Sequence, residues 1–494
     1  MKKRYLAVFI SALVSSLPFS FSQLWFLTLA FPSVFFYLLF KSEDKKEIRH
    51  ISFIWAVTYY LGIHYYFIAL YPLDFAGLSN FASLLVVIIG WIGISLFQGS
   101  ELALFFILFK RINKKLNLLS PLVLGALFAL CEWLQSLFWF GFPWGQLALT
   151  QHAFLPFIQS LSLFGPYFIT FIIVSINGCL ALFFTSKKRL PLILALLIFV
   201  SNTVFGTIRL YTEPLVDKTV SVAIVQPSLM SGEKWDLTKG KSAFDVHVKM
   251  SEKLNGADLI VWSETAVPSD LADSSYRMEI INNLLREKDC DLLTGAFHGK
   301  YNAALYIDEN GVSTYFKQRL VPFGEYVPMR GFIEAVLPFM ADINMLSSDL
   351  SAGEESTVFE TDNGKIGALV CFDSIFTNLA RNSAKNGAEL ITIITNDSWY
   401  KTSTALTHHN AQAVFRAVEN NRWVVRCANS GISSFIDSRG RITTQTEPLE
   451  CTSVTENVSL VKNKTLYTLT GNIFTPITAL LLAAYVLLCK KVDP

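Results

Sequence analysis

The chain has 494 residues, of which 52% are hydrophobic and only 16% are charged, and its mean hydropathy is +0.42. An ordinary soluble domain is about 25% charged, so this composition excludes a disordered protein and indicates a membrane protein with a polar part attached. The formal net charge of +2 gives no electrostatic case for nucleic acid as a partner. Seven cysteines without C-x-x-C spacing predict neither a disulfide framework nor a zinc site.

The N-terminal part, 1–211, predicts seven membrane-spanning helices. One helix over the uncharged segment 5–40 would be about 54 Å long, whereas the hydrocarbon core of a bilayer is about 30 Å thick. We therefore expect two helices there, with a break near 18–22. The further spans are expected at 51–71, 82–109, 118–140, 154–184 and 189–208. The alternative for the first span is a cleaved signal peptide, because three basic residues precede a short apolar run.

The loops between these spans predict the orientation of the chain, because cytoplasmic loops carry the excess of lysine and arginine. Basic residues gather at 2–4, 41–49, 110–115, 187–189 and 490–491, whereas the intervening loops near 73–80 and 141–151 have none. Both termini are then cytoplasmic, and the segment 212–465 lies outside the cytoplasm. An eighth span at 468–489 falls within the last predicted domain, 466–494, which ends in a short cytoplasmic tail.

The segment 212–465 predicts one α/β domain. Short apolar runs typical of buried strands occur at 220–225, 259–262, 292–296, 365–371, 390–395 and 423–428. Helical patterns lie between several of them, at 241–255, 275–288, 374–386 and 405–421. Alternating strands and helices over such a length favour a single α/β domain.

Three stretches of this domain carry residue types suited to covalent catalysis. Cys371 follows a buried strand where a helix begins, a position that favours a thiolate, although free cysteines are often only small buried hydrophobes. Glu264 directly follows the run 259–262, at the edge of a sheet where α/β sites are built. Lys317 and Glu325 lie in an apolar stretch shaped by proline and glycine, and the alternative for such residues is a solvated salt bridge.

In their order and contexts, Glu264, Lys317 and Cys371 resemble the Glu-Lys-Cys triad of the nitrilase superfamily. That resemblance implies an αββα sandwich for the α/β domain. The sequences Glu132-Trp-Leu, Gly141–Trp144 and Gly165–Tyr167, with the eight spans, resemble the membrane region of bacterial apolipoprotein N-acyltransferases. The contexts of Trp235 and of Asn396–Tyr400 add to the match.

The family resemblance implies roles for individual residues. Cys371 would be the nucleophile, Glu264 the base, and Lys317 the cation beside the thiolate and the oxyanion. The substrate-binding residues would be Trp235, Glu325, Phe372 and Asp373. Neither a cofactor nor a metal is implied. The chain departs from the usual pattern at Ser263, where the family often has proline, and at Phe372-Asp373, where Tyr-Glu is more usual.

The resemblance also implies a reaction and a place. Cys371 would take an acyl chain from a phospholipid as a thioester and pass it to the α-amine of the diacylglyceryl-cysteine of an apolipoprotein, the final step of lipoprotein maturation. The protein would span the bacterial inner membrane, with the catalytic domain facing the periplasm. One alternative is a membrane-tethered amidase of the same superfamily acting on a small substrate. Another is a receptor or transporter whose outer domain only binds a ligand.

Three further features stay open at this stage. Asp397 with His408 and His409 could suggest a metal, but adjacent helix residues point about 100° apart and no third ligand is suitably spaced. Glu101 and Glu132 lie in or near spans, where an ionisable residue is either functional or paired within the bundle. The apolar insertion 329–351 is either a lid that touches lipid or part of the core of the α/β domain.

Overall fold

A computed structural model describes residues 2–73, 78–137, 141–230, 242–271, 274–336 and 348–492. The chain divides into two compact units. The helical unit comprises Met1–Ile68, Val86–Glu213 and Leu469–Pro494. The α/β unit comprises Ala69–Leu85 and Pro214–Thr468.

The helical unit consists of helices of very different length. Within the described residues the α-helices are α1 (Lys2–Ser20), α2 (Pro32–Lys41), α3 (Lys45–Ile63), α4 (Asn80–Ile112), α5 (Ser120–Leu134), α6 (Leu155–Ile158), α7 (Leu161–Phe164), α8 (Pro166–Ser186), α9 (Leu190–Tyr211) and α18 (Phe474–Val492). Segments of 3₁₀-helix, labelled η, are η1 (Ser22–Leu29), η2 (His64–Leu70), η4 (Pro143–Gly145) and η5 (Leu147–Gln151). Among the described residues, five helices are long and apolar enough to cross a membrane: Ser22–Lys41, Lys45–Leu70, Asn80–Ile112, Pro166–Ser186 and Leu190–Tyr211. Shorter apolar helices cover Ser120–Leu134, Leu155–Phe164 and Phe474–Leu488. The total of eight spans therefore stays a prediction.

Local sequence explains where several of these helices begin and end. The expected break near 18–22 is present, since α1 ends at Ser20 and η1 begins at Ser22. The expected span 154–184 is wrong in its extent. Gly165 adopts φ +75°, a left-handed conformation that ends a helix, and α8 begins only at Pro166. The span expected at 118–140 likewise ends early, because α5 stops at Leu134.

Helices α5 and α8 pack closely because each has a glycine at the contact. A Cβ atom on Gly125 would lie 2.8 Å from the Phe171 carbonyl oxygen, and one on Gly178 would lie 2.9 Å from the Pro121 Cα. Small residues of this kind let two helix backbones approach inside a membrane.

Glu132 on α5 is buried in the helical unit and binds two other elements. One carboxylate oxygen accepts from the Leu147 N–H at 2.7 Å, and the other accepts from the Thr170 hydroxyl at 2.6 Å. Tyr167 on α8 donates to Ser136 at 2.8 Å, just beyond the C-terminal end of α5. Residues of the family-like sequences in this unit therefore tie α5, η5 and α8 together, and Glu132 is paired within the bundle.

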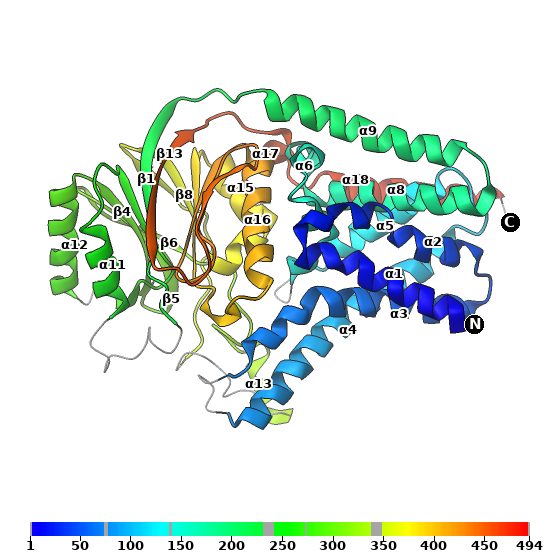
Figure 1. Ribbon diagram of the computed structural model, residues 1–494, viewed down its shortest axis with the longest axis horizontal. Helices are drawn as coiled ribbons and strands as arrows, with labels where there is room; N and C mark the ends of the chain where they lie inside the picture. Colours follow the sequence, from blue (N-terminus) through cyan, green and yellow to red (C-terminus); the bar gives the residue numbers. More distant parts are fainter. Residues whose placement is uncertain are drawn as a thin grey trace. The chain divides into compact units, whose positions relative to one another are not determined.

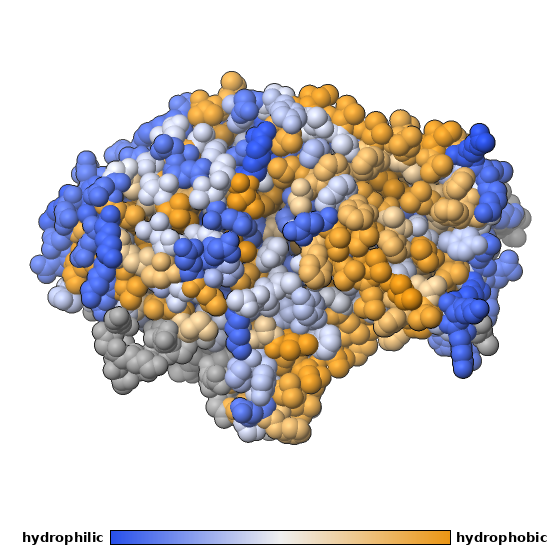
Figure 2. Space-filling view, viewed as in Figure 1, coloured by the Kyte–Doolittle hydropathy of each residue, from blue (hydrophilic) through white to orange (hydrophobic). Residues whose placement is uncertain are grey.

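The surface of the helical unit is mostly apolar. Figure 2 shows hydrophobic residues over the length of its helices and hydrophilic residues gathered at one end. Both chain termini and the turn between α8 and α9 lie at that end (Figure 1). This distribution is the one expected for a bundle with an apolar belt and a polar margin.

The α/β unit contains two sheets. The strands are β1 (Lys218–Gln226), β2 (Leu259–Trp262), β3 (Val267–Asp270), β4 (Asp291–His298), β5 (Tyr301–Asp308), β6 (Gly311–Phe316), β7 (Val358–Thr361), β8 (Gly364–Val370), β9 (Leu390–Thr395), β10 (Trp423–Ala428), β11 (Ser434–Ile436), β12 (Ile442–Gln445) and β13 (Thr452–Leu460). The first sheet has the order β13-β1-β2-β4-β5-β6, with β3 beside β4, and the second has the order β12-β11-β10-β9-β8-β7. Parallel pairing is confined to β1-β2-β4, to β3-β4 and to β8-β9-β10, while the remaining strands pair antiparallel.

The two sheets pack face to face, and helices cover their outer faces (Figure 1). The core between the sheets joins Val222, Ile224 and Val261 of the first to Ile366, Val370 and Ile394 of the second. On its other face the first sheet packs against α11 (Ala243–Ser251) and α12 (Ser275–Lys288). The second sheet is covered by α15 (Thr377–Lys385) and α16 (Ala405–Asn420). The expected αββα sandwich is confirmed.

Buried strands and amphipathic helices of this unit follow the sequence closely. Strands β2, β9 and β10 and helix α12 have the expected bounds, and α16 ends one residue earlier than expected. Strand β13 was not expected from the sequence, because most of its residues are only partly buried and it carries polar residues throughout. It pairs along the whole of β1 and thereby completes the first sheet.

Candidate active site

The three predicted catalytic residues each follow the end of a strand. Glu264 comes two residues after β2, Lys317 directly follows β6, and Cys371 directly follows β8. Strands β2 and β6 belong to the first sheet and β8 belongs to the second. Side chains from both sheets therefore meet at one end of the sandwich.

Lys317 is 1% exposed and lies between two carboxylates. Its Nζ atom donates to Glu264 Oε1 at 3.2 Å and to Glu325 Oε1 at 2.9 Å. Burial by itself would lower the pKa of Lys317, but the negative charges of Glu264 and Glu325 outweigh burial and raise the pKa well above its usual range. Lys317 is therefore a permanent cation in this site.

Both carboxylates are held in place by further donors. Glu264 Oε2 accepts from the Asn396 N–H, at the end of β9, at 2.8 Å. Glu325 Oε2 accepts from the Val321 N–H at 2.8 Å. Asn302, on β5, donates to Oε1 of both glutamates at 2.8 Å. The Glu264 carboxylate thus joins groups of both sheets at a fixed position.

Cys371 adopts φ +50°, a conformation that non-glycine residues rarely populate and that surrounding structure must hold. Its side chain is partly buried. Burial raises the pKa of the thiol far above its usual range, the Glu264 carboxylate raises it further, and the Lys317 cation opposes both. This raised pKa favours the protonated thiol over the thiolate.

Asp373 links the turn that carries Cys371 to the loop that carries Lys317. One of its oxygens accepts from the Gln318 and Arg319 N–H groups at 3.2 and 2.8 Å. The other accepts from the Val370 N–H at 3.1 Å and the Tyr315 hydroxyl at 2.9 Å. Burial raises the pKa of Asp373 to about 6, although Lys317 and these donors oppose the rise.

Of the other two residues expected to bind substrate, the structure describes Phe372 but not Trp235. Phe372 is buried and contacts Phe376 edge to face, with ring centroids 5.4 Å apart. Trp235 lies outside the described residues. Of the insertion 329–351, the residues 337–347 also lie outside them. In the described part Met329 and Phe332 are exposed, the latter on α13 (Arg330–Val336).

The metal alternative receives no support from the described residues. His409 lies 2.9 Å from Asp397, but that carboxylate is also paired with Arg426 at 2.6 Å. No group of three histidine, cysteine, aspartate or glutamate side chains in the described part of the chain is arranged to hold a metal ion.

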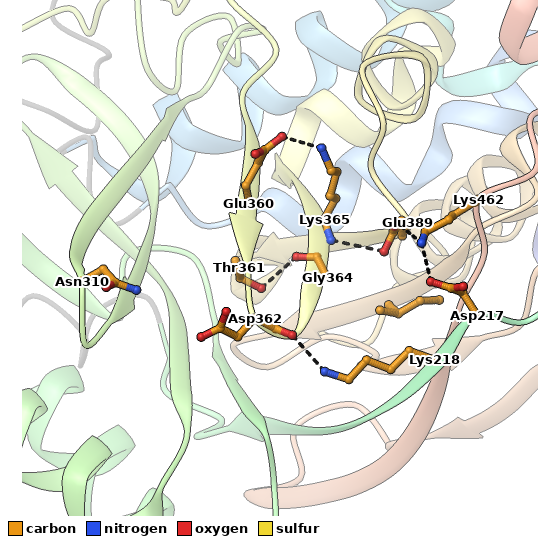
Figure 3. Close-up of a pocket in the computed structure, with 11 residues that line it drawn as sticks. Asp217, Lys218, Asn310, Glu360, Thr361, Asp362, Gly364, Lys365, Glu389 and Lys462 are labelled. Atoms are coloured by element: carbon orange, nitrogen blue, oxygen red, sulfur yellow. Dashed lines mark hydrogen bonds and ion pairs between the residues drawn. The ribbon is translucent and has the colours of Figure 1, made fainter.

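A charged hollow lies at the opposite end of strand β8. Its lining includes Lys365, whereas Cys371 lies six residues further along, about 20 Å at the rise of a strand. Figure 3 shows that several of the charged side chains there pair with one another and that Lys218 binds the Asp362 carbonyl oxygen. Lys365 pairs with Glu360, and Lys462 pairs with Asp217 and Glu389. The hollow is separate from the predicted catalytic residues.

Asn302 is the residue of this site that sequence analysis missed. It is a polar residue inside a strand whose central residues are buried, and that is the one local signal the sequence offers. An asparagine in a strand has no specific meaning until the fold brings Glu264 and Glu325 to its side chain.

Comparison with known proteins places the whole chain in one family. The carbon-nitrogen hydrolase family matches residues 221–462, and the apolipoprotein N-acyltransferase N-terminal domain matches residues 11–179. An apolipoprotein N-acyltransferase of Rickettsia prowazekii is 31% identical over 443 residues, which cover 85% of this chain and 86% of the relative. That of Geobacter metallireducens is 34% identical over 68% of this chain and 67% of its own. That of Haemophilus influenzae is 26% identical over 95% of this chain and 91% of its own. The chain therefore belongs to the apolipoprotein N-acyltransferase family, a membrane-embedded branch of the nitrilase superfamily.

Proposed function

We propose that this protein transfers an acyl chain from a phospholipid to the α-amine of the diacylglyceryl-cysteine at the N-terminus of an apolipoprotein. The observation that carries the proposal is the meeting of Glu264, Lys317 and Cys371 at one end of the sandwich, in a chain of this family. Cys371 is the nucleophile, Glu264 the general base and Lys317 the fixed cation.

In the first half-reaction, Glu264 takes the proton from the Cys371 thiol as the sulfur attacks the ester carbonyl of the phospholipid. A raised thiol pKa requires such a base, because little thiolate exists beforehand. Lys317, a buried cation, stabilises the negative oxygen of the tetrahedral intermediate. The intermediate collapses to a thioester, and the leaving alkoxide takes the proton from Glu264 and departs as lysophospholipid.

In the second half-reaction, the lipoprotein amine attacks the thioester carbonyl. Glu264 takes a proton from the amine, and the Cys371 sulfur leaves and is reprotonated. The product is an amide, and the enzyme returns to its starting state. The two substrates therefore react in a ping-pong order, with the acyl group held on Cys371 between them.

The family resemblance implies that Glu325 and Asp373 bind substrate. We propose that they also support this chemistry, through Lys317 and the Cys371 turn and without taking a proton. Glu325 holds the ammonium of Lys317 at 2.9 Å, and Asp373 ties the end of β8, directly before Cys371, to the loop that carries Lys317. Trp235 and Phe372 are proposed to contact the acyl chain or the lipopeptide.

A membrane location suits both substrates. Extracting an acyl chain into water costs about 0.8 kcal/mol per buried CH₂, so a site that receives chains from the bilayer avoids that cost. We propose eight spans in the bacterial inner membrane, with residues 212–465 on the periplasmic side and residues 466–494 forming the last span and a cytoplasmic tail.

Mass spectrometry of the full-length protein tests the proposal. Incubation with phosphatidylethanolamine and phosphatidylglycerol vesicles should add one acyl mass to the peptide that contains Cys371. Addition of a synthetic diacylated lipopeptide should remove that mass and yield the N-acylated product. Cys371→Ser should abolish both steps, because a hydroxyl is far less ionised than a thiol.

Two outcomes would contradict the proposal. Acyl mass on Cys290, Cys427 or Cys451 would show that the nucleophile is wrong. Free fatty acid as the main product, with or without lipopeptide, would favour a hydrolase, the class to which the amidase alternative belongs.

A further inference from the structure

A network of three buried polar side chains, Asp397, His409 and Ser374, reaches the backbone of Cys371. His409 on α16 lies with Nδ1 2.9 Å from Asp397 and with Nε2 2.8 Å from the Ser374 hydroxyl. The Ser374 hydroxyl donates to the carbonyl oxygen of Cys371 at 2.7 Å, and His409 Nε2 lies 3.2 Å from the same oxygen. Asp397, His409 and Ser374 each expose 1% of their surface or less.

Asp397 fixes the orientation of the His409 ring. Its Oδ2 atom is paired with Arg426 at 2.6 Å, and the Thr395 hydroxyl donates at 3.1 Å to Oδ1, the same oxygen that His409 Nδ1 contacts. Burial alone would raise the pKa of Asp397, but Arg426 and His409 hold it below its usual range, so the carboxylate is ionised. Because an ionised carboxylate only accepts hydrogen bonds, His409 Nδ1 donates, and Nε2 faces Ser374 and the Cys371 carbonyl.

The arrangement resembles a Ser-His-Asp set, but Ser374 is not placed to attack a substrate. It has no exposed surface, and its hydroxyl is engaged with the Cys371 carbonyl. Its own carbonyl oxygen accepts from Arg416, which is paired with Glu419. The network of Asp397, His409 and Ser374 therefore contacts the backbone of the turn that carries Cys371 and is not placed to contact a substrate.

The backbone that these side chains contact adopts a conformation that needs support. Cys371 has φ +50°, a conformation that persists when its surroundings over-determine it. The peptide group between Cys371 and Phe372 is planar, so contacts to its carbonyl oxygen fix the orientation of the whole group. The Ser374 hydroxyl donates to that oxygen and restricts its rotation, while the His409 ring, which Asp397 orients, lies with Nε2 3.2 Å from the same oxygen.

We propose that Asp397, His409 and Ser374 are positioning residues that hold the peptide group after Cys371 in the orientation that acyl transfer requires. This inference rests on the proposed function, because it assigns these residues a part in the acylation of Cys371. We expect this network to affect the rate of acylation more than the rate of alkylation of the sulfur. Acylation requires the turn to be oriented toward the substrate carbonyl, whereas alkylation depends mainly on the nucleophilicity of the sulfur.

Ser374→Ala is the first test, with Ser383→Ala as its matched control. Ser383 is also buried, on α15, but its hydroxyl has no hydrogen-bond partner among the described residues. Acylation of the full-length protein by phospholipid vesicles is followed in a single turnover, and alkylation of Cys371 by iodoacetamide is followed in parallel. We expect Ser374→Ala to slow acylation by about 10²-fold, the loss typical of misplacing a reacting group by about 1 Å. Alkylation should stay near the wild-type rate, and Ser383→Ala should change neither.

His409→Gln and His409→Asn provide the second test. The glutamine amide reaches the place of Nε2, beside Ser374 and the Cys371 carbonyl, whereas the asparagine amide reaches the place of Nδ1, beside Asp397. We expect His409→Gln to retain more acylation than His409→Asn. Glutamine is also closer to histidine in volume, so alkylation of Cys371 and thermal unfolding are followed for both variants. A role in packing alone predicts that alkylation and the unfolding midpoint fall together with acylation, whereas a positioning role lowers acylation alone. The pair also decides the question if Ser374→Ala does not fold.

The outcomes separate this inference from the proposed function. If the wild-type protein is acylated and Ser374→Ala is acylated at the same rate, the inference is overturned and the proposed function is not affected. Equal losses of acylation and alkylation in a folded Ser374→Ala, or His409→Asn retaining more acylation than His409→Gln, would also overturn it. Failure of the wild-type protein to form the thioester would overturn the proposed function itself.

Discussion

The charges of Glu264 and Lys317 act on the Cys371 thiol in opposite directions, and this makes their roles separable. The Glu264 carboxylate raises the pKa of the thiol and the Lys317 ammonium lowers it. Glu264→Gln should therefore increase the rate of iodoacetamide alkylation at pH 8, whereas Lys317→Met should decrease it. Both should slow phospholipid acylation by at least about 10²-fold, because one removes the base and the other the oxyanion cation.

The pH dependence of alkylation checks the same assignment. Because burial and Glu264 raise the thiol pKa, the wild-type rate should keep rising with pH beyond 9 and not level off near 7. A plateau near neutral pH would indicate a thiolate already formed by Lys317. In that case Glu264 would not be needed as a base in the first half-reaction.

Asp373 is a second residue whose geometry gives a definite expectation. Four hydrogen atoms point at its two oxygens, so Asp373→Asn places an amide group against donors whichever way it turns. We expect a loss of about 1–3 kcal/mol in the free energy of unfolding, as for other buried donors left without an acceptor. Acylation should fall as well, since the Lys317 loop loses its attachment to the catalytic turn.

Asp308→Asn is a matched control for that substitution. Asp308 caps the turn after β5 with a single oxygen, which accepts from the Asn310 and Gly311 N–H groups. An asparagine oxygen can accept the same two bonds, so chemical denaturation of Asp308→Asn should resemble the wild type. If the two variants were equally stable, the linking role of Asp373 would be contradicted.

Between elements, the contact of α5 with α8 gives the sharpest expectation. Gly178→Ala places a methyl 2.9 Å from the Pro121 Cα, closer than carbon atoms pack, so the helices must separate. Overpacking of this kind costs about 1–3 kcal/mol. Thermal unfolding in detergent should show a lower midpoint, and Gly125→Ala should behave similarly.

The comparison substitution for this contact is Gly93→Ala on α4. Among the described residues, and apart from the backbone of the helix itself, no heavy atom lies within 4 Å of the Cβ position there. Alanine favours helix over glycine by about 1 kcal/mol, so this variant should unfold at or above the wild-type midpoint. If Gly93→Ala lowers the unfolding midpoint, or if Gly178→Ala does not lower it, the glycines of α5 and α8 do not act by allowing close approach of the helix backbones.

At the scale of the whole molecule, the predicted topology decides which compartment receives the catalytic unit. A reporter that is active only outside the cytoplasm should work when fused after Thr212 and stay silent when fused after Lys188. The reason is that the basic residues at 187–189 predict a cytoplasmic loop, from which α9 would then cross the membrane. The reverse pattern would invert the orientation and remove access to lipoproteins on the outer face.

The sequence by itself determined the division into an apolar helical part and an α/β part, because composition, short apolar runs and helical patterns are local properties. It also determined β2, β9, β10 and α12, whose apolar residues are buried on a continuous face. It overextended the span at 154–184, since hydropathy does not register that Gly165 turns the backbone before Pro166.

Only the tertiary structure decided how the site is held together. Glu264, Lys317 and Cys371 are recognisable one by one, but Asn302 and His409 acquire meaning from residues that are distant in the chain. Asn302 lies 38 and 23 positions from the two glutamates that it binds, and His409 lies 38 positions from the carbonyl it faces. Asn302 on β5 meets the loops that follow β2 and β6, and His409 on α16 meets the turn that follows β8. No local pattern encodes those meetings.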